Sequence, residues 1–437
     1  MSRISWAGRG TAVAGLAIAA VLGAGCGSSS GGGTTPPSTT PTGTGAGSGS
    51  MAILQVGGST YAFVPSPTGV SAVKIGSATL LASAGGSPLA LSSATSRAIT
   101  LTVLPDACAA DWVNAKVICG SFSSGTVTVI DASSTAFTST SYDTGLTSSV
   151  SYSGGSCVVC GLLYDPKEDE TILATAAGYS FFDHLKTHAI TRTIAASVAE
   201  NFGYDPVTDQ IFSPQYQTSP ASIDVVPAAG TNVYSLSPSP ATLSSPDHGA
   251  VDSSTGVAIT AEEYSLDAYL VALGTEQLGA PSAGAFTALE ATLPLNHTQD
   301  CSWPLSDIAV ESSAHLAFFS AEFCNAGNDM MGVAQLPRTA PVTAADLTIS
   351  DYAFAHIPDP ATGITWTSPG DPHGIANFTL SAGTLHYGLL VNADKTYVAV
   401  VDLVKLLAAP RDATDAHLVS PTYDLVANGV VTFFLLP

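Results

Sequence analysis

Short apolar segments separated by polar turns recur along residues 51–437 of the 437-residue chain. In four passages the unit reads as an apolar strand, an Asp or Glu, a turn rich in Pro, Ser or Thr, and a second apolar strand: residues 162–183, 202–215, 249–263 and 308–322. Asp-Pro and Ser-Ser-Thr-Gly favour a tight reversal between antiparallel strands. The pattern therefore predicts repeated antiparallel hairpins.

A third strand follows in several units and alternates between apolar and polar residues, as in "TVTVID" (126–131). Alternation of this kind predicts a strand with one buried and one exposed face. Candidates for this strand define seven units, spaced by 43 to 66 residues, near Val73, Val129, Phe182, Val225, Val271, Val333 and Ala399. A period of this size with few helical stretches is typical of a β-propeller. We predict an all-β propeller domain over residues 51–437, with seven blades favoured over six or eight.

The C-terminal segment "GVVTFFLLP" (429–437) is strongly apolar and predicts one further strand. We expect this strand to complete the blade that begins with "AILQVGG" near Ala52. Such pairing between the two ends of the chain would close the ring and remove exposed strand edges.

Residues 371–402 carry the sequences "DPHGIANF" and "LLVNADKTYVAVVD". This passage resembles the YVTN/NHL type of propeller repeat, which runs Pro-x-Gly-Ile-Ala, then a strand ending in Val-Ala-Asn, then a Val-x-Val-Ile-Asp strand. The matching residues are Pro372, Gly374, Ile375, Ala376, Val391, Asn392, Val400, Val401 and Asp402. The resemblance implies a propeller in which the Pro-x-Gly-Ile-Ala element opens the innermost strand beside the central channel. It is specific for a fold and does not specify a function.

Two histidines occupy similar positions, His373 in "GDPHGIA" and His248 in "SPDHGAV". By the resemblance both would lie on the channel rim, near the carboxylates of Asp371, Asp247 and Asp252. Two histidines with carboxylates could hold a divalent metal or act as acid and base, which would make the protein a lactonase-like or other hydrolase. The alternative is that both histidines are polar turn residues facing water.

Long segments between the predicted strands, such as residues 103–116 and 279–304, predict loops on a rigid ring. Loops of this kind suit recognition of a protein or a glycan. Trp112, Trp303 and Trp366 lie in or near these loops and are either contact residues or local core residues. We therefore expect a binding or scaffold module, with the hydrolase as the alternative.

The chain is acidic, with 12 Lys and Arg against 34 Asp and Glu and a formal net charge of −22. Nucleic-acid binding requires clustered basic residues on the protein surface. The composition therefore excludes a nucleic acid as the partner.

At the N-terminus, Arg3 and Arg9 precede an apolar run that reaches Cys26. Residues 1–25 therefore resemble a bacterial lipoprotein signal peptide. Residues 26–50 then form a tract of Gly, Ser, Thr and Pro that predicts a flexible tether. The resemblance implies an acylated Cys26 that anchors the protein to a membrane, in the outer membrane or at the cell surface of a bacterial envelope. The alternative is an ordinary secreted protein cut near the same place.

Six cysteines follow Cys26, and an even number in an exported chain predicts disulfides. Six cysteines permit fifteen connectivities, and the sequence does not select one. Local pairing is the simplest expectation because each pair then falls inside one repeat: Cys108–Cys119, Cys157–Cys160 and Cys301–Cys324.

Overall fold

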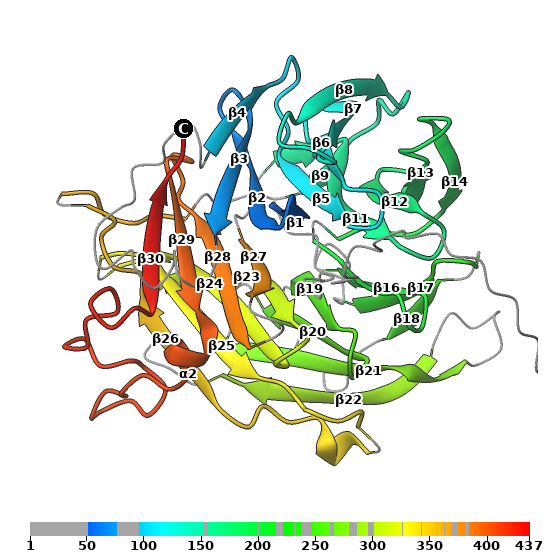
Figure 1. The fold of residues 1–437 in the computed structure, drawn as a ribbon. Helices are drawn as coiled ribbons and strands as arrows, with labels where there is room; N and C mark the ends of the chain where they lie inside the picture. Colours follow the sequence, from blue (N-terminus) through cyan, green and yellow to red (C-terminus); the bar gives the residue numbers. More distant parts are fainter. Residues whose placement is uncertain are drawn as a thin grey trace, which may run out of the picture. The chain divides into compact units, whose positions relative to one another are not determined.

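A computed structural model describes residues 51–76, 96–152, 155–199, 201–215, 222–230, 233–236, 246–262, 266–278, 286–295, 301–325, 327–341, 343–361, 363–368, 375–380 and 384–437. These residues contain seven four-stranded antiparallel sheets, arranged around a centre as the blades of a β-propeller (Figure 1). The predicted fold class and the predicted number of blades are both confirmed.

The first three blades occupy residues 52–194. Blade 1 contains β1 (Ala52–Val56), β2 (Ser59–Ser66), β3 (Gly69–Gly76) and β4 (Ser96–Thr100). Blade 2 contains β5 (Ala107–Asp111), β6 (Lys116–Ser121), β7 (Ser124–Asp131) and β8 (Thr138–Asp143). A two-stranded hairpin, β9 (Val150–Tyr152) and β10 (Gly155–Cys157), precedes blade 3. Blade 3 contains β11 (Val159–Asp165), β12 (Glu170–Thr175), β13 (Gly178–Phe182) and β14 (Ile190–Ile194).

The remaining four blades occupy residues 203–435. Blade 4 contains β15 (Gly203–Asp205), β16 (Gln210–Gln215), β17 (Ser222–Pro227) and β18 (Tyr234–Leu236). Blade 5 contains β19 (Pro246–Asp252), β20 (Val257–Glu262), β21 (Asp267–Leu278) and β22 (Phe286–Pro294). Blade 6 contains β23 (Cys301–Glu311), β24 (Leu316–Cys324), β25 (Met330–Gln335) and β26 (Tyr352–His356). Blade 7 contains β27 (Ile375–Leu380), β28 (Leu385–Val391), β29 (Tyr397–Asp402) and β30 (Val431–Leu435).

All seven residues that marked the predicted third strands lie on the third strand of a blade. They fall on β3, β7, β13, β17, β21, β25 and β29 in turn. Two short helices connect strands within the described residues, η2 (Ala344–Asp346) and α2 (Leu403–Leu407). Within the described part of the chain, neither helix is long and apolar enough to cross a membrane.

The expected pairing of the C-terminal strand with the first blade is wrong. β30 pairs with β29 and is the outer strand of blade 7, whereas β1 pairs with β2 in a blade that already has four strands of its own. Blades 1 and 7 instead meet through side chains. Phe434 of β30 is buried in one cluster with Val64 and Val73 of blade 1 and Leu389 of blade 7.

Hydrophobic clusters fill the spaces between neighbouring blades, because each sheet buries residues on both faces. Close approach of two sheets depends on particular small residues. A Cβ atom added at Gly388 of β28 would lie 2.5 Å from the ring of Phe318, which is fully buried on β24 of blade 6. Only glycine therefore allows this aromatic ring to approach the backbone of blade 7 so closely.

Three disulfides join Cys108 to Cys119, Cys157 to Cys160 and Cys301 to Cys324. Two of them link directly opposed residues of the first and second strands of a blade, and the third links the end of β10 to β11. The prediction of disulfides is confirmed. Stable disulfides are typical of proteins outside the reducing cytosol, so the structure indicates an oxidising compartment.

Candidate functional site

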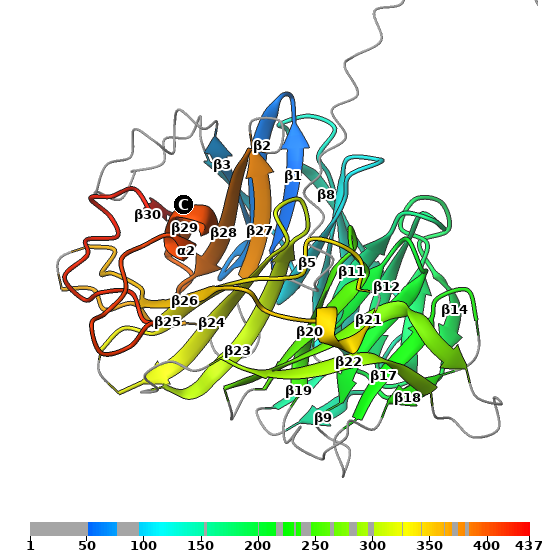
Figure 2. The same cartoon turned by 90° about the horizontal axis from the view of Figure 1, so that it is seen from below.

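The first strand of each blade lines the centre of the ring, and these strands run in the same direction (Figures 1 and 2). The ring therefore has two distinct faces. We call the face at which the first strands begin the N-terminal face, and the face at which they turn into the second strands the C-terminal face. Each face carries its own set of polar side chains.

A hollow of about 540 Å³ opens on the N-terminal face beside blade 2. Three segments form its wall: the loop before β5, the turn between β6 and β7, and the segment that contains the β9–β10 hairpin. Its lining combines four hydroxyl groups and one carboxylate with three apolar side chains: Ser123, Thr147, Ser149, Ser156, Asp106, Leu104, Phe122 and Val158. A surface of this composition can both donate and accept hydrogen bonds beside an apolar contact.

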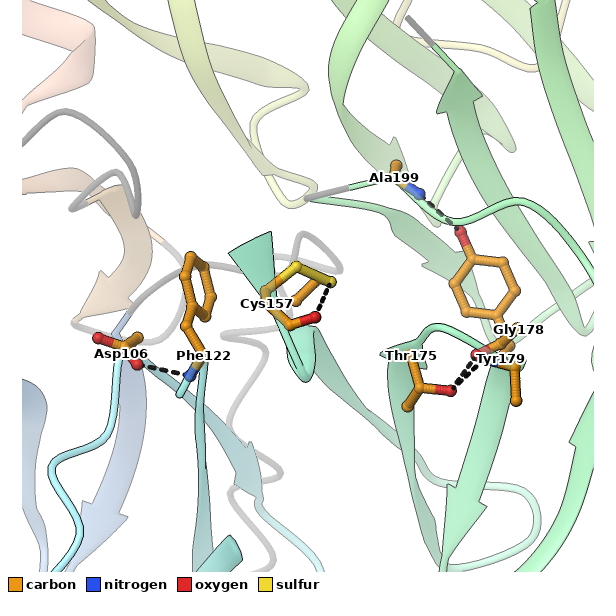
Figure 3. Close-up of a disulfide and its surroundings, with 9 residues drawn as sticks. Asp106, Phe122, Cys157, Thr175, Gly178, Tyr179 and Ala199 are labelled. Carbon is orange, nitrogen blue, oxygen red and sulfur yellow. Dashed lines mark hydrogen bonds between the residues drawn. A yellow bond between two sulfur atoms is a disulfide. The ribbon is translucent and has the colours of Figure 1, made fainter. Parts of the chain in front are cut away.

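The carboxylate of Asp106 is held in place by the turn between β6 and β7. Its Oδ2 accepts a hydrogen bond of 2.6 Å from the backbone N–H of Phe122. The backbone N–H of Val158 donates to the carbonyl oxygen of Phe122 at 2.8 Å, which fixes the start of β11 against the same turn. The Cys157–Cys160 disulfide lies beside Phe122 and packs with it (Figure 3). A disulfide between β10 and β11 therefore constrains one wall of the hollow.

Lys395 brings a positive charge toward this carboxylate from the turn between β28 and β29 of blade 7. Burial lowers the pKa of the Lys395 ammonium below its usual 10.5, although the negative charge of Asp106 acts in the opposite direction. The electrostatic influence therefore acts between the loop before blade 2 and a turn of blade 7.

His248 lies near the start of β19, the innermost strand of blade 5, as the repeat resemblance implied. Its side chain is 2% exposed, and its Nδ1 donates a hydrogen bond to the backbone carbonyl of Ser306 in blade 6. Asn201, which precedes β15 of blade 4, forms a parallel bridge with His248 and donates from Nδ2 to Oδ1 of Asp307 at 3.2 Å. These contacts tie three neighbouring blades together near the centre.

The other predicted members of a histidine site are not brought together with His248 by the described residues. His373 and Asp371 lie outside the described residues, as does the side chain of Asp247. Asp252 lies at the opposite end of β19, on the C-terminal face. The shared histidine site therefore stays a prediction.

The three predicted tryptophans have different environments. Trp366 is fully buried, with its ring 5.8 Å from that of Phe433, so it is a core residue. Trp112 is partly buried and packs edge-to-face against Tyr164 at 4.9 Å. The side chain of Trp303 lies outside the described residues, as do Cys26 and the whole of the predicted tether.

A set of buried acids on the C-terminal face was not expected from the sequence. At four boundaries between blades, an acid at the end of a first strand meets a donor from the next blade. The pairs are Asp111 with His184 at 2.9 Å, Asp165 with Tyr204 at 2.8 Å, Asp252 with His315 at 2.8 Å and Glu311 with His386 at 2.8 Å. We call these pairs the turn-acid bridges.

The turn-acid bridges are charge-assisted contacts in a largely buried setting. Burial by itself raises the pKa of the Asp111 carboxyl, but hydrogen bonds from His184 and from Asn114 outweigh burial and lower it below 3.8. The sequence pattern predicts only a turn residue at the repeated acid after the first strand. The sequence signal was present, because an acid ends the first strand in five of the seven blades, but the partner is more than 35 residues away in every pair.

The fold and the disulfides define a seven-bladed β-propeller protein of an oxidising compartment. No protein-family model matches the chain, and no curated protein matches it. The YVTN/NHL resemblance therefore stays at the level of the repeat pattern.

Solved propeller-like structures are similar to the chain only at low sequence identity. A putative 6-phosphogluconolactonase from Bacteroides fragilis is 11% identical, with 85% of this chain and 95% of that chain covered and a TM-score of 0.41. A functionally unknown protein from Desulfotomaculum acetoxidans is 10% identical over 79% of this chain and 89% of that chain, with a TM-score of 0.46. Hydrazine synthase from Kuenenia stuttgartiensis is 12% identical, with 69% of this chain and 77% of that chain covered and a TM-score of 0.41. These similarities carry no argument about activity.

Proposed function

We propose that this protein is an extracytoplasmic binding module that holds a neutral or basic glycan in the hollow on its N-terminal face. The observation that carries the proposal is the lining of that hollow, which combines the hydroxyl groups of four residues with the carboxylate of Asp106: Ser123, Thr147, Ser149 and Ser156. Sugar hydroxyls need partners that both donate and accept hydrogen bonds, and serine and threonine side chains do both.

Two further features favour this ligand class. Leu104 is 46% exposed at the edge of the hollow, so it offers an apolar surface to the C–H face of a sugar ring. The formal net charge of −22 disfavours an acidic glycan by like-charge repulsion, and the carboxylate of Asp106 acts in the same direction where the Lys395 charge does not offset it. A neutral sugar or an amino sugar fits both features.

The alternative hydrolase with an axial metal or a His/acid site has less support in the described residues. His248 is almost completely buried, and its Nδ1 is engaged with the Ser306 carbonyl oxygen. A general base must reach a substrate proton, either directly or through one water molecule. The binding module is therefore the better-supported function.

We also propose that the propeller is held at a bacterial membrane by acylation of Cys26. The support is the pattern of the first fifty residues, in which an apolar run of signal-peptide length ends at Cys26 and an uncharged tract follows. A tether of this kind would present the propeller and its hollow away from the membrane surface.

The glycan proposal is tested by substitution at Asp106. Screening the purified protein against an array of neutral, basic and acidic glycans identifies a ligand, and calorimetry measures its affinity. We expect Asp106→Asn to weaken binding about tenfold or more, because it replaces a charged acceptor by a neutral one. The amide oxygen can still accept from the backbone of Phe122, so the turn is retained.

Asp131→Asn is the matched control, because Asp131 lies at the other end of blade 2, where it pairs with Lys116 at 3.1 Å. This variant should bind the glycan as the wild type does. Equal loss of affinity in both variants, or selective binding of acidic glycans by the wild type, would contradict the proposal.

A further inference from the structure

Two acids and a histidine converge on the C-terminal face, at the boundary between blades 2 and 3. One ligand atom each from Asp111, Asp169 and His184 lies within 4.8 Å of the others, and it is the one such group among the residues that the structure describes. We propose that this cluster is a binding site for a divalent transition-metal ion such as Zn²⁺. The proposal is independent of the glycan hollow, because β5 separates the two sites along its full length.

The histidine is oriented as a metal ligand requires. Its Nε2 points at the cluster, 2.9 Å from Oδ2 of Asp111, and its Nδ1 lies 3.0 Å from the hydroxyl of Thr171. Metal-bound histidines typically use their second ring nitrogen in such a hydrogen bond, which fixes the ring and the tautomer. Thr171 and His184 are both essentially buried, so this orientation is rigid.

Asn114 supplies a fourth group. Its Nδ2 lies 2.7 Å from Oδ1 of Asp169 and 3.0 Å from Oδ2 of Asp111, and so bridges the two carboxylates. Rotation of the amide by half a turn would place its oxygen at the same point, facing the centre of the cluster. The two carboxylates and the imidazole are ligand types that Zn²⁺ uses in proteins, and the amide oxygen would be available for the fourth position.

The spacing of the ligand atoms is close to that of a metal site. In tetrahedral coordination, with bonds of about 2.1 Å, neighbouring ligand atoms are about 3.4 Å apart. The pairs measured here span 2.7 to 3.0 Å where they are hydrogen-bonded, and at most 4.8 Å across the cluster. A metal ion would need shifts of about 1 Å, which side-chain rotations can supply.

The charges of the cluster favour a cation. Asp111 and Asp169 bring two carboxylates together, and the ion pairs found among the described residues place no Lys or Arg against either of them. The imidazole of His184 is the basic group in contact with Asp111. A divalent ion would balance both carboxylates in a setting where uncompensated charge is costly.

The boundary between blades 3 and 4 has a similar pair of acids, and a tyrosine contacts both of them. There the hydroxyl of Tyr204 lies 2.8 Å from Oδ1 of both Asp165 and Asp209, and bridges the two acids. Tyr164 occupies the corresponding place at the cluster and donates to Asp169 at 2.7 Å. The cluster therefore combines the two acids and the bridging tyrosine of that boundary with His184, the histidine of its own turn-acid bridge.

A metal ion also has a route to the cluster. Asp111 and His184 are at most 1% exposed, whereas Asp169 is only partly buried. The ion would therefore arrive at Asp169 first. The rings of Tyr164 and Trp112 cover the side of the cluster with an apolar wall, and such a wall strengthens the attraction between ion and carboxylates.

The test is metal binding by the full-length, untagged protein after removal of bound metal with EDTA. Calorimetry with Zn²⁺, and visible absorption with Co²⁺, should show one ion per chain. His184→Gln should weaken Zn²⁺ binding at least about 100-fold and abolish the Co²⁺ absorption, because one ligand is lost. Glutamine can still donate a hydrogen bond to Asp111, so the variant keeps the bridge between the blades.

His315→Gln is the matched control, because His315 forms the turn-acid bridge with Asp252 at another boundary. It should bind Zn²⁺ as the wild type does. Asp169→Asn provides a second variant that is expected to fold, because Asp169 has a φ of 62° and asparagine tolerates this conformation well. The proposal is overturned if the wild type takes up no Zn²⁺, or if His184→Gln and Asp169→Asn both bind it with wild-type affinity.

Discussion

Asp224 on β17 is a buried carboxylate whose surroundings favour its neutral form. Burial raises the pKa of Asp224 above 3.8, and the hydrogen bond of 2.6 Å that Ser235 donates to Oδ1 offsets this only in part. As pH rises above 3.8, the unfolded chain loses this proton before the folded chain does. The free energy of unfolding therefore falls until pH passes the folded pKa.

Asp224→Asn should consequently stabilise the protein at about pH 7, because the amide remains neutral and still accepts from Ser235. The gain should shrink toward zero at about pH 3, where Asp224 is protonated in both states. Thermal unfolding of the variant and the wild type across this range measures the difference. A variant that is less stable than the wild type at neutral pH would contradict the argument.

Asp131 provides a control of opposite sign. A hydrogen bond from the backbone of Ser133 lowers the pKa of Asp131, and its contacts with the Ser133 and Lys116 side chains act in the same direction. The ionised Asp131 therefore adds to the free energy of unfolding above pH 3.8, and this contribution is lost as pH falls through the lowered pKa of the folded protein. Asp131→Asn should therefore be less stable than the wild type at neutral pH and equal to it in acid.

At the scale of single elements, β30 holds the last blade to the first. Phe433 and Phe434 are consecutive and point to opposite faces of blade 7, so Phe433 packs toward blade 6 and Phe434 toward blade 1. Both rings are at most 3% exposed. The strand thus seals two boundaries at once, although its hydrogen bonds lie entirely within its own blade.

Phe434→Ala should lower the free energy of unfolding by about 3–5 kcal/mol, because it leaves a cavity in the cluster shared by blades 1 and 7. Urea denaturation measures the change. Leu435→Ala on the same strand is the control, since Leu435 is 38% exposed, and its effect should stay below about 1 kcal/mol. Similar losses in the two variants would mean that burial against blade 1 is not what stabilises this strand.

The elements were predictable to the extent that their signals are local. The alternation in "TVTVID" and in the other third strands reports burial on one or both faces, and all seven were located correctly. The partner of β30 was not, because an apolar strand at the end of the chain suits the open edge of either blade 1 or blade 7. The sequence of a single strand does not indicate which neighbouring strand it will pair with.

The candidate sites depend on contacts between residues that are far apart in the sequence, so the sequence alone did not predict them. His248 was placed on the innermost strand through the repeat pattern, but its burial against Ser306 follows from the packing of blade 6. The hollow combines a loop, a turn and a hairpin spread over residues 104–158. Asp111 and His184 are 73 residues apart, and no spacing rule connects them.

At the scale of the whole molecule, the predicted anchor gives a test that does not depend on the propeller. Cys26→Ser should move the protein from the membrane fraction to the soluble fraction of a bacterial host, because the acylation site is removed. Ultracentrifugation followed by mass analysis of the N-terminal peptide measures both location and lipid. Ser28→Ala should remain in the membrane fraction. A soluble wild-type protein, or a membrane-bound Cys26→Ser variant, would contradict lipid anchoring.

Each blade is one continuous stretch of chain, and this holds for the two blades at the seam between blades 1 and 7. Met51 and Leu436 lie in the same hydrophobic cluster, so the two ends of the propeller are neighbours. Joining these ends and opening the chain between β18 and β19 would leave all seven sheets uncut. The blade at which the chain begins can therefore be changed, and a gene of this kind can be circularly permuted without dividing any sheet.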